Sequence, residues 1–137
     1  MKLEICDWVR PHVTPVPSKF RTVAMNRHGR FIFSKAAEEY FLLKEGMYIA
    51  FAEDTDSRND WYITFQALKS NGSVIRYTHS ASNHSRALIT NNKEAANAIL
   101  DSVKADKGAS LLIAMKPVNF NGMDWHKLLT SKPIRIR

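Results

Sequence analysis

The strongest constraint on the fold is a series of short apolar segments that are separated by turn residues. Two of them, Phe20–Met25 and Arg30–Phe33, have the length and the apolar content of β-strands. Residues 26–29 between them form a turn, in which Gly29 can supply the positive φ that such turns often need. We expect further strands, in chain order, at Met47–Ala52, Trp61–Phe65, Ser73–Thr78, Arg86–Thr90 and Leu111–Lys116.

Two segments separate the strands in the middle of the chain. Asn71-Gly72 is the strongest short hairpin signal in the sequence, and it predicts that Trp61–Phe65 pairs with Ser73–Thr78. Glu53–Asp60 contains four acidic residues, and it is predicted to be a solvated acidic loop.

Two short helices interrupt the strands. Ser34 can act as an N-cap, because its hydroxyl can accept a free backbone N–H of the first turn, and the helix that it begins extends to about Leu43. Asn91 is the predicted N-cap of the second helix, with Glu94 three residues later as the acid of a capping box. This second helix is predicted to end near Lys104.

Together these elements predict an α+β protein with mostly antiparallel sheets and two short helices, in the order β-β-α-β-β-β-β-α-β. Residues 1–18 contain three prolines and are predicted to be an extended N-terminal arm, so that residues 19–137 form a single domain. The tail after the last strand is predicted to be irregular, with Trp125 and Leu128 docked on the body.

Composition and motifs narrow the class of protein. The single cysteine excludes an internal disulfide bond, and the chain contains no run of the ~20 apolar residues that a membrane-spanning helix needs. The N-terminus lacks the apolar segment of a signal peptide, which favours a soluble, cytoplasmic protein. No nucleotide-binding loop, nucleophile elbow or zinc-protease motif is present, so we expect a non-enzymatic protein without a cofactor or a metal ion.

Charge is distributed unevenly along the chain. The formal net charge is +7, but residues 38–60 carry seven acidic residues against two basic ones, whereas the segments on both sides are basic. A polarised basic surface attracts polyanions and accelerates their association. This pattern favours a nucleic-acid partner.

One segment resembles a known family of DNA-binding proteins. Gly29–Lys35, then Phe41, then Leu43–Gly46, with apolar residues at Ile49 and Phe51, is similar to the AbrB/SpoVT-type module. That module has a Gly-Arg turn, an alternating strand, a short helix, an apolar-Lys-x-Gly corner and another strand.

The similarity extends without a gap over residues 29–51, about a sixth of the chain. Ser34, Leu42 and Met47 depart from the family pattern, which usually has proline, glycine and an acidic residue at these positions. The resemblance implies a homodimer of swapped hairpins that contacts DNA with basic residues near its first strands. Arg30 and Lys35 occupy matching positions.

The sequence therefore predicts a nucleic-acid-binding, transcription-regulator-like protein that uses its basic first hairpin. We expect the contacts to come from Lys19, Arg21, Arg27, His28, Arg30, Lys35, Arg76, Tyr77 and Arg86. An alternative route is a sheet face on which Tyr62, Phe65 and Tyr77 stack single-stranded bases, as in PC4-like or PUR-like proteins. The rival functions are a non-catalytic protein–protein or structural accessory module, for example of a mobile element, and a small-molecule-binding domain.

Overall fold

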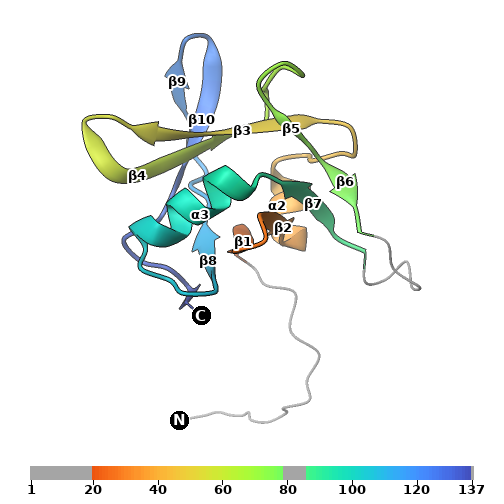
Figure 1. The fold of residues 1–137 in the computed structure, drawn as a ribbon. Coiled ribbons are helices and arrows are strands. Elements are labelled where there is room, and N and C mark those ends of the chain that lie inside the picture. The colour runs from red at the N-terminus through yellow and green to blue at the C-terminus, as the bar shows by residue number, and fades with distance from the viewer. Residues whose placement is uncertain (1–19, 79–85, 137) are drawn as a thin grey trace, which may run out of the picture.

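The computed structural model describes residues 20–78 and 86–136 of the chain. The elements in chain order are β1 (Thr22–Asn26), β2 (Arg30–Phe33), α2 (Lys35–Tyr40), β3 (Tyr48–Asp54), β4 (Ser57–Thr64), β5 (Ser73–Val74), β6 (Arg76–Tyr77), β7 (Leu88–Asn91), α3 (Lys93–Ser102), β8 (Gly108–Leu112), β9 (Val118–Phe120), β10 (Met123–Leu128) and β11 (Arg135–Ile136). The predicted α+β class is confirmed, with antiparallel pairing and two short helices (Figure 1).

The strands form two antiparallel sheets. The six-stranded sheet has the order β11-β8-β1-β2-β7-β6, and the five-stranded sheet has the order β5-β3-β4-β10-β9. β1 and β2 pair in the register Ala24 opposite Ile32, around the turn that the sequence predicts. Gly29 in that turn has a φ of +93°, so the expected positive φ is confirmed.

The two sheets are joined on both sides. On one side, β5 of the five-stranded sheet and β6 of the six-stranded sheet are separated by Ile75 alone, whose N–H donates to the carbonyl of Met47 at 2.8 Å. On the other side, an antiparallel bridge between Ile113 and Leu128 connects the end of β8 to β10. The sheets therefore enclose one interior in a closed, barrel-like arrangement.

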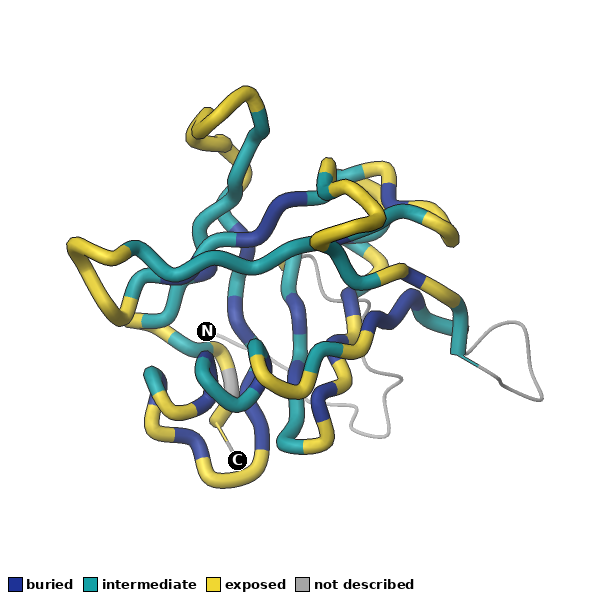
Figure 2. The backbone as a smooth tube through the Cα atoms, turned by 45° about the horizontal axis from the view of Figure 1, so that its top comes forward, coloured by how far each residue is buried: buried dark blue, intermediate teal, exposed yellow. Residues whose placement is uncertain are grey.

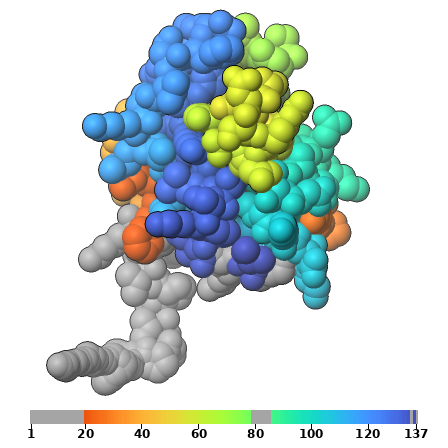
Figure 3. All heavy atoms as spheres, turned by 90° about the vertical axis from the view of Figure 1, so that its left-hand side faces the viewer, coloured from red at the N-terminus to blue at the C-terminus, as the bar shows by residue number. Residues whose placement is uncertain are grey.

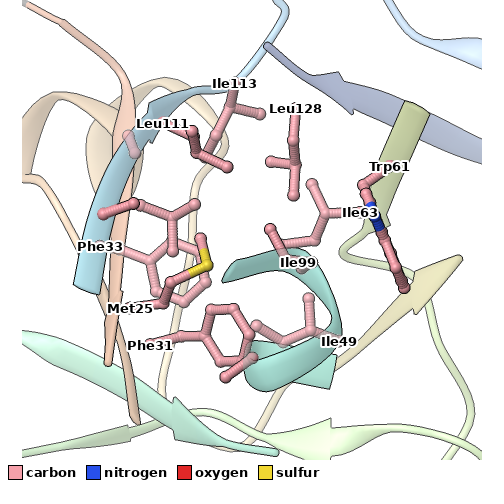
Figure 4. Close-up of a cluster of buried hydrophobic side chains, with 14 of the residues drawn as sticks. Met25, Phe31, Phe33, Ile49, Trp61, Ile63, Ile99, Leu111, Ile113 and Leu128 are labelled. Atoms are coloured by element: carbon pink, nitrogen blue, oxygen red, sulfur yellow. The ribbon is translucent and has the colours of Figure 1, made fainter. Parts of the chain in front are cut away.

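Helix α3 covers one end of this barrel and contributes to its core. Ile99 on α3 is fully buried and lies among side chains of both sheets, for example Phe31 from β2 and Ile63 from β4 (Figure 4). At the C-terminal end of α3, the indole N–H of Trp61 donates to the hydroxyl of Ser102 at 2.9 Å. Figure 2 shows the same arrangement, with buried segments inside and exposed turns at the periphery.

The caps of the helices are side-chain oxygens. Ser34 is the N-cap of α2, as predicted, and its hydroxyl accepts the N–H of Ala37 at 3.1 Å. The prediction for α3 was one residue too early, since the cap is Asn92, whose side chain accepts the N–H of Ala95 at 3.1 Å. Asn91 is the last residue of β7 and is still paired with Arg30, so its backbone is held in the ladder.

The predicted acidic loop is instead the hairpin of β3 and β4, whose turn is short and whose strands continue through the acidic residues. The carboxylate of Asp54 accepts the N–H of Asp56 at 2.9 Å and closes the turn. Across the hairpin, Arg58 pairs with Glu53 at 3.1 Å. Acidic residues at the end of a two-stranded ribbon stay solvated, so a strand accommodates them as well as a loop does.

The predicted hairpin at Asn71-Gly72 is also wrong. β5 pairs with β3 and not with β4. Residues 65–72, which connect β4 to β5, form a loop. The side chain of Asn71 accepts the N–H of Leu68 within this loop. Gly72 passes so close to β3 that an added Cβ would lie 2.9 Å from the Cβ of Tyr48.

The C-terminal tail is not irregular, because it forms β9, β10 and β11. Asn121 and Gly122 have φ values of 54° and 79° and make the tight turn between β9 and β10. Leu128 is fully buried in the core, as expected. Trp125 lies on β10, opposite Val118 of β9. The predicted extended arm, residues 1–18, lies outside the described residues.

Candidate nucleic-acid interface

The strands of the two sheets differ in charge. No Asp or Glu is present in the six strands of the larger sheet, which carry Arg30, Arg76 and Arg135. The strands of the five-stranded sheet carry four acidic residues against two basic ones, namely Glu53, Asp54, Asp60 and Asp124 against Arg58 and Lys127. Figure 3 shows the β3–β4 hairpin, in yellow, between the C-terminal strands and α3.

Arg30 and Arg76 lie on the same outer face of the six-stranded sheet. Phe31 and Phe33 are buried, so Arg30 and Ile32 point away from the core. Ile32 is opposite Ile89 in the register, and Ile89 is opposite Arg76. Arg76 therefore shares the face of Arg30, with β7 between them, and sheet spacings put their α-carbons about 12 Å apart.

Both of these arginines are exposed, and within the described part of the chain neither guanidinium has a hydrogen bond or an ion pair. Asn91, exposed on β7, is opposite Arg30. Ile32 on the same face is 37% exposed, whereas Ile89, between Ile32 and Arg76 in the register, is 2% exposed, so the face is buried at that position. This outer face is therefore cationic and uncompensated by acidic residues of its own strands.

Arg27, one of the residues predicted to contact nucleic acid, is held by several contacts within the chain. Its guanidinium donates to the carbonyls of Ala105 at 2.6 Å and Asp106 at 3.0 Å, and to the side chain of Asn97 at 2.9 Å. It also pairs with Asp101 at 2.9 Å. These partners lie on α3 and in the connection to β8, so Arg27 holds the β1–β2 turn to the helix.

A second group of the predicted residues lies near α2, at the other end of the barrel. The guanidinium of Arg21 lies 4.9 Å from the ring centroid of Tyr40, and that of Arg86 lies 4.5 Å from the ring centroid of Tyr77. The ammonium of Lys35 donates to the carbonyl of Arg86 at 2.9 Å. The predicted cations are thus divided between two ends of the molecule and one sheet face.

His28 is exposed at the tip of the β1–β2 turn, and Lys19 lies outside the described residues. The fold brings two further cations to this turn that sequence reasoning missed. Gly29 approaches the backbone of Lys93, and the N–H of Arg27 donates to the carbonyl of Lys107 at 3.2 Å. Only the tertiary contact between the turn and α3 relates these lysines to Arg30, so no local pattern indicates them.

The predicted aromatic platform is not a single surface. Phe65 points inward and packs against Phe33, with ring centroids 6.1 Å apart. Tyr62 is paired with Lys127 on the opposite side of its strand from the buried Trp61 and Ile63. Tyr77 lies in the other sheet.

Two further observations concern the described residues as a whole. None of their helices is long and apolar enough to cross a membrane. No group of three His, Cys, Asp or Glu side chains among residues 20–78 and 86–136 is arranged to hold a metal ion.

The chain matches no family model, no curated protein and no solved structure.

Proposed function

We propose that this protein is a non-enzymatic nucleic-acid-binding protein of the transcription-regulator type, and that it binds through the outer face of its six-stranded sheet. The observation that supports this proposal most is the pair Arg30 and Arg76, which are exposed, unpaired with any described residue and on one face. Lysine and arginine contacts to phosphates provide most of the sequence-independent affinity for DNA.

The AbrB/SpoVT-type resemblance is consistent with this assignment. The similar segment corresponds to β2, α2 and β3, with Arg30 in the first strand and Lys35 at the start of the helix. Leu42 has a φ of 54°, a conformation that glycine adopts without steric cost, and the family usually has glycine there. A homodimer is a further part of the proposal that the resemblance implies.

The direct test is to titrate the protein into a short labelled duplex, and into a labelled single strand of the same sequence, at low salt. Fluorescence anisotropy measures the binding. The test variant is Arg30→Ala with Arg76→Ala. The control is Arg58→Ala with Lys127→Ala, which removes the same charge from the five-stranded sheet, where each cation already pairs with an acid.

We expect the test variant to raise Kd by about ten- to hundredfold, since two charge-assisted contacts are lost. The control should change Kd by less than about threefold, because paired surface cations contribute little. The proposal is contradicted if the protein binds neither the duplex nor the single strand at low salt. Equal weakening by the two variants contradicts the assignment to this face.

A non-catalytic interaction module is the second candidate function, and the edge strand β9 favours it. Val118 and Phe120 on β9 are 54% and 63% exposed, and the strand contains no charged residue. The unpaired backbone N–H and C=O groups of an exposed apolar edge strand are a template for pairing with another chain. Sedimentation experiments test this function. It is favoured if the protein associates in a concentration-dependent way, if Phe120→Asp abolishes the association, and if the protein does not bind nucleic acid.

A further inference from the structure

The barrel-like interior is covered by α3 at one end and opens at the other end beside α2. At that mouth lies a hollow of about 300 Å³, with Leu42 and Met47 at its rim. Its other lining residues come from the segment after α2, from the end of β4 and from β10, and are Phe41, Phe65, Gln66, Asp124 and His126. Barrel mouths are preferred positions for small-ligand sites, and such sites begin at about this volume.

Three rings form the wall of this mouth. The ring centroids of Phe41 and Phe65 are 4.9 Å apart, and that of His126 lies 4.7 Å from Phe41 and 5.7 Å from Phe65. Phe65 in turn packs on Phe33 at the end of the core. The rings are therefore held in place by one another before any ligand enters.

The polar groups of the mouth are oriented by their own hydrogen bonds. The Nδ1 atom of His126 lies 2.8 Å from the carbonyl of Ala114, so in the neutral ring Nδ1 donates to this carbonyl and Nε2 is an acceptor. The amide oxygen of Gln66 accepts the N–H of Asp124 at 2.9 Å, which leaves its NH₂ group as a donor.

Asp124 adds the one formal charge among the lining residues that the structure describes. Its Oδ1 accepts a hydrogen bond from Asn119 at 3.3 Å, and the second carboxylate oxygen has no partner among the described residues. The mouth thus presents a carboxylate and an imidazole nitrogen as acceptors, one amide donor, and ring faces. This set complements a positive, planar ligand that is rich in N–H donors.

We propose that the barrel mouth binds a small planar organic cation of the guanidinium or amidinium class. The carboxylate of Asp124 supplies the counter-charge, and the guanidinium fork matches a carboxylate in geometry. The rings of Phe41 and Phe65 supply cation–π and stacking contact. The same region already holds one such pair, since the guanidinium of Arg21 lies over Tyr40 beside Phe41.

Other ligand classes fit less well. An anion would face the Asp124 carboxylate, and none of the lining residues within 20–78 and 86–136 is a cation that would offset this repulsion. A neutral apolar ligand would desolvate the carboxylate and leave its acceptors unmatched, which costs free energy. The site does not depend on the proposed nucleic-acid interface, because neither Arg30 nor Arg76 lines the mouth.

The test is isothermal titration and ¹H–¹⁵N NMR of the full chain with three ligands of one shape. Benzamidine is the cationic probe, benzamide is neutral and benzoate is anionic. We expect benzamidine to bind, and to shift the amide signals of Phe41, Gln66 and His126. Benzamide should bind at least about tenfold more weakly, since a charge-assisted contact is replaced by a neutral one, and benzoate should not bind.

The variant Asp124→Asn keeps the shape and the contact to Asn119 but removes the charge. It should weaken benzamidine binding by about ten- to hundredfold. Asp56→Asn at the tip of the β3–β4 hairpin is the matched control, and it should leave Kd unchanged. Thermal melts check that both variants fold.

The ligand series on the unaltered chain keeps the proposal testable if Asp124→Asn does not fold. Equal affinity for benzamidine and benzamide overturns the proposal. Signal shifts confined to the surface away from the mouth, or equal weakening by the two Asp variants, also overturn it.

Discussion

The two sheets share one interior but present opposite chemistry to the outside. On the six-stranded sheet, Arg30 and Arg76 face outward and no strand carries an acidic residue. On the five-stranded sheet, acids outnumber bases, and its cations Arg58 and Lys127 are paired. The interior requires only that alternate residues be apolar, so the outer residues of each strand are free to differ. The net charge of +7 is therefore distributed unevenly between the outer faces of the two sheets.

The first hairpin shows the same division on a smaller scale. Arg27 and Arg30 are three residues apart, yet the guanidinium of Arg27 is held by α3 and its connection to β8, whereas that of Arg30 is exposed. A basic residue in such a sequence cluster is thus available to bind another molecule only when its side chain is not already held by contacts within the fold.

The largest effect on stability is expected from substitutions of the hairpin glycines of the two sheets. In Gly29→Ala the new Cβ would lie 2.5 Å from the backbone Cα of Lys93, at a φ of +93°. We expect a loss of at least about 3 kcal/mol in the free energy of unfolding, from the disfavoured backbone and the overlap together.

The matched change in the five-stranded sheet is Gly122→Ala, which has a positive φ of 79° but no atom within 4 Å of the new Cβ. Only the backbone cost of about 1–2 kcal/mol remains there. Urea denaturation measures both variants. Equal losses would show that the contact between the β1–β2 turn and α3 does not constrain the fold.

A smaller difference is expected between arginines. Arg27→Ala removes the hydrogen bonds to Ala105, Asp106 and Asn97, and it should cost about 2 kcal/mol of stability. Arg58→Ala removes one pair to Glu53 from a side chain that is 71% exposed, and it should change stability by less than about 0.5 kcal/mol.

Thermal or urea denaturation of both arginine variants checks this difference. If Arg27→Ala is as stable as Arg58→Ala, and nucleic-acid binding falls instead, then Arg27 contacts the ligand and is not a structural residue.

Much of the fold could be predicted because local signals agreed with the tertiary structure. β2 has the predicted bounds, Arg30–Phe33, since a turn with a required glycine precedes it and an N-cap serine follows it. The buried residues of α3, among them Ile99 and Leu100, follow a helical period that the sequence displays. Elements with a signal at both ends were located to within a few residues.

Strand partners could not be predicted in the same way. Asn-Gly occurs twice in the chain, at 71–72 and at 121–122, and only the second is a hairpin turn. At 71–72 the asparagine side chain is used inside the loop, and the next strand pairs with β3. This pairing depends on how the two sheets close, which a dipeptide does not encode.

The candidate site was predicted only in part, for the same reason. The alternation of β2 indicates that Arg30 points outward, but the common face of Arg30 and Arg76 follows from the position of β7 between them. The partners of Arg27 are about 70 residues further along the chain, so its structural role had no sequence signal.

The most direct test of the central claim is the salt dependence of nucleic-acid binding. Log Kd for a duplex is measured against log salt for the unaltered chain, for Arg30→Ala with Arg76→Ala, and for Arg58→Ala with Lys127→Ala. Each phosphate contact contributes about 0.9 to the slope, so the first double variant should reduce it by about 1.8 and the second should leave it nearly unchanged. Equal reductions in both, or a slope near zero in the unaltered chain, would contradict a binding face on the six-stranded sheet.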